Sequence, residues 1–149
     1  MFCYSFEYEI IGSDALDKEN DMTIAIDLET ELAEKTTFLE GRTRHTDTKG
    51  YFARIADYRD GGIFAAGFSG TAQWERHNTG DEIVQILKGS VTMTLRTKDG
   101  DERLDLKAGM IAVVPKGTWH QFVSPDGVTI MTTTPQPTEH IEDENPPMD

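Results

Sequence analysis

Residues 70–89 read Gly70-Thr-Ala-Gln-Trp-Glu75-Arg-His77-Asn-Thr-Gly-Asp-Glu82-Ile-Val-Gln-Ile-Leu-Lys-Gly89. Farther along, residues 109–124 read Gly109-Met-Ile-Ala-Val-Val-Pro115-Lys-Gly117-Thr-Trp-His120-Gln-Phe-Val-Ser124. Both stretches combine short apolar runs with turn residues, as β-strands and their connections do. If both lie in a small β-barrel, two histidines and two carboxylates converge, which predicts a divalent metal site made of Glu75, His77, Glu82 and His120.

The alternation of side chains along a strand gives this site its expected geometry. Residues two apart point to the same face, so Glu75 and His77 point together. Residues 78–81 are turn-like and fold the next strand, with Glu82, back beside the first. Imidazole and carboxylate donors suit Fe(II), Mn(II), Ni(II) or Zn(II), and four of them leave two octahedral positions open. Two residues that share the parity of the ligands are predicted to line a substrate pocket: Gln73 and Phe122.

The pattern of residue types in residues 51–134 predicts an all-β fold. Short runs of β-branched and aromatic residues alternate with turn residues, which favours a sandwich or barrel over βαβ units. Glycines supply the positive φ of tight turns in three places: Asp60-Gly61-Gly62, Lys98-Asp99-Gly100 and Pro125-Asp126-Gly127. We expect strands near residues 51–58, 62–68, 71–77, 82–88, 90–97, 101–106, 111–114, 118–123 and 127–134.

The two ends of the chain differ from this barrel. Residues 1–50 are predicted to form an N-terminal extension, in which residues 1–21 are either an extra edge strand or a dispensable segment. Residues 30–39 permit a short helix. Residues 135–149 hold four of the six prolines and little apolar surface, which predicts a loose, disordered acidic tail.

The formal net charge of −13 comes mainly from these ends. Residues 1–21 carry six acids and one base, and residues 135–149 carry five acids and no base, so −3 remains for residues 22–134. No basic stripe is present to neutralise phosphates, which argues against nucleic-acid binding. There is no apolar run long enough to cross a membrane. The absence of a signal-peptide pattern and the single cysteine, Cys3, predict a cytoplasmic location.

The two quoted stretches resemble the paired motifs of the cupins, which are small double-stranded β-helix barrels of the jelly-roll type. The first cupin motif has a glycine, His-x-His, then Glu and a final Gly. His77, Glu82 and Gly89 fit its last three positions, with the two spacings between them that the motif requires. The second motif has glycine, Pro-x-Gly and His, and this chain matches every spacing with Gly109, Pro115, Gly117 and His120. The resemblance covers residues 51–134 and implies a metal-binding jelly-roll barrel.

Three features depart from the family pattern. Glu75 stands in place of the first motif histidine, the spacer after Gly70 has four residues instead of five, and Ser124 replaces the final asparagine. The resemblance therefore implies that Glu75 is a fourth ligand beside the three that match, His77, Glu82 and His120. A carboxylate in place of an imidazole lowers the charge of the site by one, which favours harder ions.

Several of these residues have other interpretations. Glu75 is also consistent with a residue outside the metal shell that pairs with a base such as Arg54 or Arg76. If it stays off the metal, it is the best candidate for a catalytic general base. Glu82 is also consistent with an exposed turn carboxylate, and the two motif histidines with a barrel that has lost its metal.

The remaining histidines and the tryptophans lie outside this constellation. His45 and His140 are expected at the surface. Trp74 and Trp119 have the opposite strand parity from the ligands, which favours a packing role.

The function predicted from the sequence is that of a single-domain metal-binding cupin that acts on a small organic molecule. The family leaves open an oxygenase, an isomerase or a lyase, because a fold does not fix a function. The alternative is a non-catalytic ligand-binding or sensor module, with or without metal. A homodimer is expected, with residues 1–10 and 51–58 at the contact, because small barrels leave edge strands to be covered.

Overall fold

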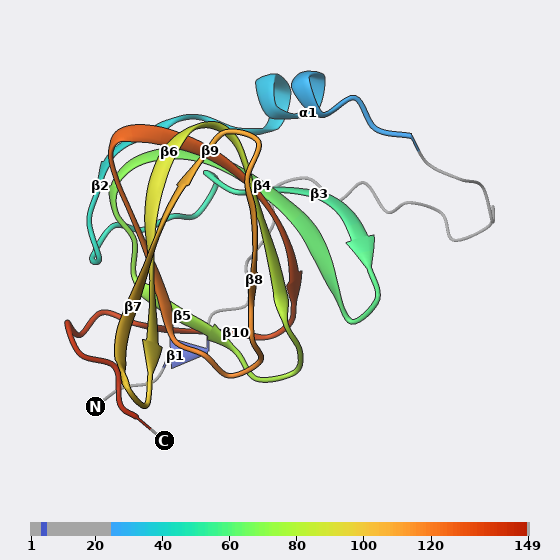
Figure 1. Ribbon diagram of the computed structural model, residues 1–149. Helices are drawn as coiled ribbons and strands as arrows, with labels where there is room; N and C mark the ends of the chain where they lie inside the picture. Colours follow the sequence, from blue (N-terminus) through green and yellow to red (C-terminus); the bar gives the residue numbers. More distant parts are fainter. Residues whose placement is uncertain (1–3, 6–24, 149) are drawn as a thin grey trace.

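The structure, a computed structural model, describes residues 4–5 and 25–148 (Figure 1). Within them the chain is mostly strand with a single short helix, which confirms the predicted all-β class. The elements are β1 Tyr4–Ser5, α1 Leu28–Lys35, β2 Leu39–Arg42, β3 Ala53–Tyr58, β4 Gly61–Thr71, β5 Trp74–His77, β6 Glu82–Thr97, β7 Gly100–Lys107, β8 Ile111–Val114, β9 His120–Pro135 and β10 Thr138–Ile141.

The strands form a curled sheet that closes around a core. Along it the order is β1-β10-β5-β9-β4-β2, with β3 paired to β4, and β6 paired to β7, β8 and β9. The long strands β6 and β9 cross the molecule and join its two sides, so that the sheet wraps into the barrel seen in Figure 1. The core lies inside this barrel and includes Phe68, Val84, Met93, Phe122 and Ile130. The site described below opens at one end of the same interior.

Two pairs of predicted strands are single long strands in the structure. The expected strands 82–88 and 90–97 are both part of β6, and 118–123 and 127–134 are both part of β9. The predicted turn at Gly127 is a bend within β9, and Gly89, between two predicted strands, is a bend within β6. Gly89 has a φ of +74°, and a Cβ added there would lie 2.1 Å from the carbonyl oxygen of Gly127. The two strands therefore bend where their backbones touch, and a side chain at Gly89 would separate them.

The C-terminal segment corrects the prediction of a loose tail. Residues 138–141 form β10, which pairs antiparallel with β5 and places His140 opposite Glu75. The prolines and acidic residues suggested disorder, but Thr138 and Ile141 are buried and the edge of β5 requires a partner. On its other side β10 pairs with β1, in which Tyr4 stands opposite His140. The rest of the segment expected to be an edge strand or extension, residues 1–3 and 6–21, lies outside the described residues.

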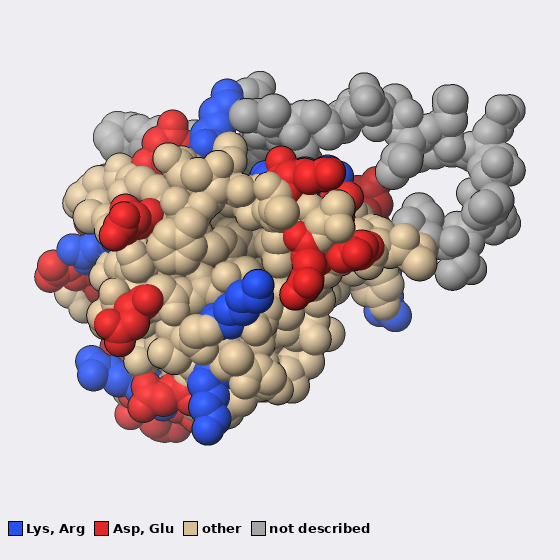
Figure 2. Space-filling model, turned by 90° about the horizontal axis from the view of Figure 1, so that it is seen from above, with Lys and Arg blue, Asp and Glu red and all other residues tan. Residues whose placement is uncertain are grey.

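The remaining features are the short helix α1 and the distribution of charges on the surface. α1 covers most of the predicted 30–39 helix but begins earlier, because the Asp27 side chain accepts hydrogen bonds from the backbone N–H groups of Glu29 and Thr30. On the face shown in Figure 2, acidic and basic side chains are interspersed. Among the described residues, no helix has the length and apolar content that a membrane crossing requires.

Candidate metal centre

Three strands and two turns bring the four predicted ligands together. Glu75 and His77 project from β5, Glu82 is the first residue of β6, and His120 is the first residue of β9. Glu75 pairs directly with His120 across β5 and β9. The second turn is fixed beside β5, because the Gly117 N–H donates to the carbonyl oxygen of His77 at 2.8 Å. Gly117 has a φ of +77°, so the motif glycine meets a conformation that other residues adopt with difficulty.

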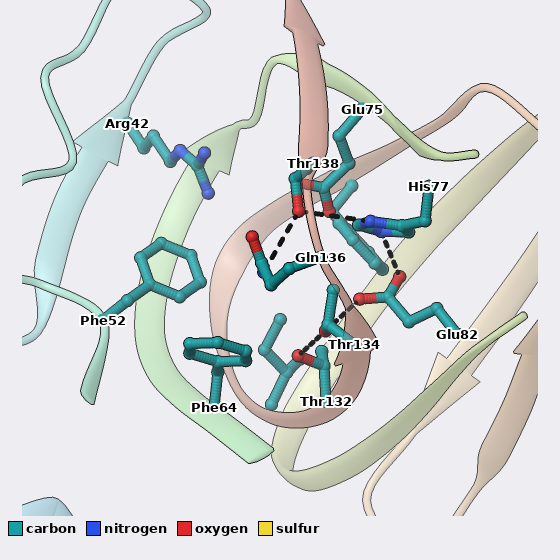
Figure 3. Close-up of a pocket in the computed structure, with 12 residues that line it drawn as sticks. Arg42, Phe52, Phe64, Glu75, His77, Glu82, Thr132, Thr134, Gln136 and Thr138 are labelled. Carbon is teal, nitrogen blue, oxygen red and sulfur yellow. Dashed lines mark hydrogen bonds and ion pairs between the residues drawn. The ribbon is translucent and has the colours of Figure 1, made fainter. Parts of the chain in front are cut away.

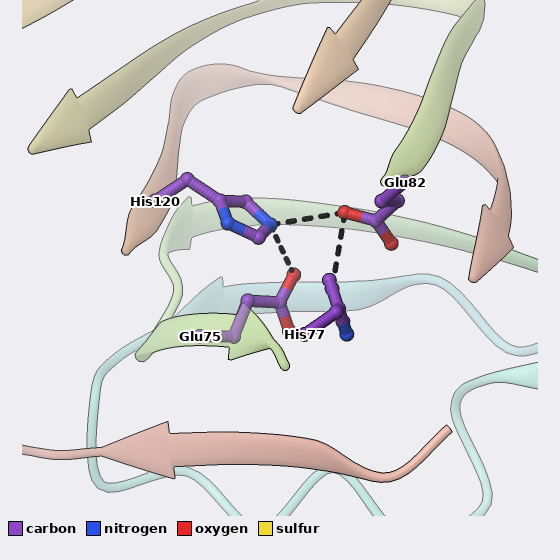
Figure 4. Close-up of side chains that lie close together, drawn as sticks. All are labelled: Glu75, His77, Glu82 and His120. Carbon is purple, nitrogen blue, oxygen red and sulfur yellow. Dashed lines mark ion pairs between the residues drawn. The ribbon is translucent and has the colours of Figure 1, made fainter. Parts of the chain in front are cut away.

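The donor atoms of the four side chains face one another (Figure 4). One atom from each lies within 4.8 Å of the others. Glu82 Oε2 is 3.2 Å from His77 Nε2 and 3.0 Å from His120 Nε2, and Glu75 Oε1 is 3.4 Å from His120 Nε2. His77, Glu82 and His120 are almost completely buried, and the Glu75 side chain is 15% exposed. Glu82 is therefore an inward-facing residue of the interior, not an exposed turn carboxylate.

Each of the three buried side chains has its outer polar atom bonded and its inner atom unbonded. His120 Nδ1 lies 3.1 Å from the Thr118 carbonyl oxygen, which makes Nδ1 the donor and directs Nε2 at the other ligands. His77 Nδ1 contacts Thr138 Oγ1 at 3.2 Å, and Glu82 Oε1 accepts a hydrogen bond from Thr134 Oγ1 at 2.6 Å. The inner atoms, His77 Nε2, His120 Nε2 and Glu82 Oε2, make no hydrogen bond of acceptable geometry. Buried donor atoms that face each other, with oriented outer partners, match the arrangement of metal ligands.

The charges within the cluster are strongly coupled. Burial by itself lowers the pKa of His120, but the carboxylates of Glu75 and Glu82 outweigh it and raise that pKa to about 10. Burial favours protonation of both carboxyls, yet the neighbouring imidazoles hold the pKa of Glu75 well below its usual range and also lower that of Glu82. In the metal-free protein, protonated His120 therefore supplies part of the positive charge that a metal cation would supply. Both carboxylates stay ionised.

Glu75 is oriented by a histidine that the sequence did not suggest. His140 Nε2 lies 3.2 Å from Glu75 Oε2, which leaves Oε1 directed at the cluster. His140 was expected at the surface, but it is only 9% exposed because β10 pairs with β5. The bases proposed as alternative partners of Glu75 are engaged elsewhere: Arg54 donates to Asp57 and Arg76 to Glu139. His45 does lie at the surface, as expected, where it contacts Glu142.

The two tryptophans lie away from the cluster and pack, as their parity predicted. Trp74 and Trp119 are both 4% exposed and form a small apolar cluster with Ile141. The guanidinium groups of Arg96 and Arg76 lie over their rings. This cluster holds β10 against β5 on the side opposite the candidate ligands.

A narrow cavity of about 20 Å³ leads to the cluster (Figure 3). It reaches Glu75, His77 and Glu82, whereas His120 is not among the lining residues. Phe122 lines this cavity, and its contact with a substrate stays a prediction. Gln73 lies half-buried between β4 and β5 and is not among the lining residues. The rest of the wall is formed by Arg42, Phe52, Phe64, Ile130, Thr132, Thr134, Gln136 and Thr138.

Some of these lining residues carried a signal in the sequence and others did not. Thr132, Thr134 and Thr138 share one parity, and the alternation within the Thr-Thr-Thr run could have indicated a polar inner face. Arg42 and Phe52 come from the segment before the barrel motifs and reach the cavity only because β2 and β3 pair with β4. That long-range pairing has no local signature.

Comparisons with known proteins agree with this architecture. Residues 64–133 match the family model of the cupin domain. A cupin-2 domain containing protein from Shewanella frigidimarina is 20% identical, with a TM-score of 0.56 over 74% of this chain and 94% of that one. A conserved protein of unknown function from Streptococcus pyogenes is 18% identical, with a TM-score of 0.54 over 79% of this chain and 93% of that one.

A protein from Neisseria meningitidis is 20% identical and has a TM-score of 0.52, with 79% of this chain and 100% of that chain covered. The search of curated proteins found no match. At such identities, the likeness to the solved structures concerns the fold alone.

Proposed function

Because the chain contains a small cupin domain, we propose that it binds a divalent metal ion and acts on a small organic molecule in the adjoining cavity. The metal is Fe(II), Mn(II), Ni(II) or Zn(II), and the reaction is an oxygenation, an isomerisation or a lyase reaction. The ligands in this proposal are Glu75, His77, Glu82 and His120.

The observation that carries the proposal is the set of inner donor atoms without hydrogen bonds. His77 Nε2, His120 Nε2 and Glu82 Oε2 are buried, lie close together and make no hydrogen bond of acceptable geometry. Leaving buried polar atoms unpaired is costly, so a protein that retains three of them together needs a compensating partner. A divalent cation would compensate all three. Two imidazoles and two carboxylates fit the ions named above, which accept mixed nitrogen and oxygen ligands.

The bound metal would supply Lewis-acid chemistry and, for iron, redox chemistry. The surrounding side chains orient the metal ligands and form the wall that a substrate would contact. Thr134 and Thr138 fix the carboxylate of Glu82 and the imidazole of His77 from outside. Glu75 is the most exposed of the four ligands and lines the cavity, so a substrate would meet the cluster on its side. Phe64 and Phe122 give this approach an apolar wall.

Metal titration of protein purified without chelators tests the binding half of the proposal. We expect one equivalent of metal in the wild type and a large loss of affinity in His77→Ala. The matched control is His45→Ala, which removes an exposed histidine from the same chain and is expected to bind metal like the wild type. Equal metal uptake by all three proteins would show that the metal is adventitious.

A turnover assay tests the second half of the proposal, that the protein acts on a small organic molecule. Metal-loaded protein is incubated with small-molecule extracts, and consumption of individual compounds is followed by mass spectrometry, with oxygen uptake measured in parallel for the iron form. We expect at least one compound to disappear with the wild type and to persist with His77→Ala. Compounds that are retained by the protein but never consumed would identify a binding module in place of an enzyme.

A further inference from the structure

The cavity beside the candidate ligands is much smaller than an organic substrate requires. Its volume of about 20 Å³ leaves room for about one water molecule. Cavities that hold small organic ligands measure roughly 300–1,000 Å³. The wall around this space must therefore move before a substrate reaches Glu75, His77 or Glu82.

Most of this wall cannot move without disrupting the barrel. Among the described residues that line the cavity, all except Phe52 and Gln136 lie within strands, where a shift of the backbone would break hydrogen bonds between strands. The backbone of Gln136 is also fixed, because its N–H donates to the Asp60 carbonyl oxygen at 3.3 Å and its carbonyl oxygen accepts a hydrogen bond from Thr79 Oγ1 at 3.0 Å. Phe52 is therefore the wall residue best placed to move.

The position of the Phe52 ring supports this conclusion. Figure 3 shows Phe52 next to Phe64, on the side of the cavity opposite His77 and Glu82. The Phe52 side chain is partly exposed, whereas Phe64 and Phe122 are only 6% and 2% exposed. A partly exposed side chain changes rotamer rapidly, while a ring in the packed core must displace its neighbours to do so. The Phe52 ring can thus turn toward solvent while the rest of the wall stays in place.

The backbone on both sides of Phe52 is anchored, so the movement is one of the side chain. Tyr51 packs against the core, and Ala53 begins β3 opposite Ala65 of β4. The guanidinium carbon of Arg42 lies 5.5 Å from the centre of the Phe52 ring. This cation–π contact favours the ring position that the structure describes, in which the cavity is closed.

From this arrangement we propose that Phe52 is the gate of the cavity and determines the size of the molecule that reaches the metal. With the ring in the position described, the cavity admits a molecule about as large as water. When the ring turns toward solvent, the space that it occupied becomes available to a larger ligand. The inference rests on the proposed function, because it concerns access to the same metal site.

Stopped-flow spectroscopy of the full-length protein loaded with Co(II) tests this gate. Co(II) accepts the same nitrogen and oxygen ligands, and its visible absorption changes when an external ligand binds to it. The probes are azide, a thin rod, and benzohydroxamate, a bulky chelator. Phe52→Ala and Phe52→Trp make the gate smaller and larger, and Gln136→Ala alters the other connection. The matched control is Phe38→Ala, which removes an exposed phenylalanine that does not line this cavity.

We expect benzohydroxamate to bind Phe52→Ala about tenfold faster than the wild type or more, because the competent open state is then always populated, and to bind Phe52→Trp more slowly. Azide should bind all the proteins at rates within about threefold of one another. Phe38→Ala and Gln136→Ala should behave like the wild type with both probes. The affinity for Co(II), measured first for each protein, should be unchanged. If circular dichroism shows that Phe52→Ala does not fold, slower benzohydroxamate binding by Phe52→Trp carries the test.

Four results would overturn the proposal. A merely structural role of Phe52 would change the azide rate or the Co(II) affinity together with the benzohydroxamate rate. Faster benzohydroxamate binding by Gln136→Ala alone would place the gate at the other connection. Equal benzohydroxamate rates for the wild type and both Phe52 variants would show that Phe52 is no gate and would leave the metal site standing. A wild type that binds no Co(II) would instead contradict the proposed function itself, so the metal measurement separates these two failures.

Discussion

Glu75 occupies the position where the family pattern has a histidine, and its two oxygens face two different histidines. Oε1 is directed at His120 and Oε2 at His140. One oxygen is therefore anchored by β10 and the other is left for the cluster. This division of roles favours a metal ligand over a free general base, whose depressed pKa would make it a weak proton acceptor near neutral pH.

Substitution of Glu75 distinguishes a ligand from a base. We expect Glu75→Gln to lower metal affinity about tenfold or more, because it removes the charge of one ligand, and Glu75→His to retain the metal with a preference shifted toward softer ions. Competition titrations measure both effects. Glu139→Gln, on the neighbouring strand, serves as control. A Glu75→Gln protein that keeps its metal affinity but loses turnover would instead make Glu75 the general base.

The raised pKa of His120 predicts proton release on metal binding. With a pKa of about 10, His120 is protonated at pH 7.5 in the metal-free protein, and the metal must displace that proton from Nε2. The apparent affinity should therefore increase with pH, by about tenfold per unit below that pKa. Calorimetry in buffers of different ionisation enthalpy should detect about one proton released. Binding without any proton release would mean that His120 is already neutral.

At the scale of the elements, β10 connects the barrel to its site. Its pairing with β5 places Thr138 beside His77 and His140 beside Glu75, so that two of the four candidate ligands depend on this strand for their outer contacts. Beyond it, residues 142–144 contribute surface ion pairs with Arg44 and His45. Such exposed pairs stabilise a protein only slightly.

Truncation separates the strand from the residues that follow it. A chain that ends at residue 141 keeps β10 and should bind metal like the full chain. A chain that ends at residue 137 should lose metal affinity by about 10–100-fold, because His77 and Glu75 lose their orienting partners. Circular dichroism shows whether the shorter chain still folds. If it does not, Thr138→Val and His140→Phe provide the same comparison within an intact barrel. Unchanged metal affinity in both would contradict this role for β10.

The sequence predicted the features that depend on local interactions and missed those that depend on pairing between distant strands. The motif spacings placed all four candidate ligands, because each depends on strand parity and on a local turn such as Pro115–Gly117. The bends at Gly89 and Gly127 were taken for strand ends, since a glycine with positive φ looks the same in a turn and in a bent strand. β10 was missed, because its pairing with β5 outweighs an unfavourable local composition. Arg42 was missed for the same reason.

At the scale of the whole molecule, the predicted homodimer stays a prediction. Among the described strands, β3, β7 and β8 each pair with a single neighbour and so leave an edge to be covered. Light scattering at micromolar concentration should give twice the 16.7 kDa mass of the chain. The mass of a monomer at that concentration would contradict the prediction. It would leave the metal site unaffected, because all four candidate ligands come from one chain.

The central claim, that a divalent metal is held inside the barrel by two imidazoles and two carboxylates, is tested most directly by X-ray absorption spectroscopy of the zinc-loaded protein. We expect a first shell of nitrogen and oxygen at about 2.0–2.2 Å and an outer-shell pattern that corresponds to two imidazoles. His77→Ala should lose one of the two imidazole contributions. An oxygen-only shell without imidazole scattering would place the metal elsewhere on this acidic chain and would contradict the claim.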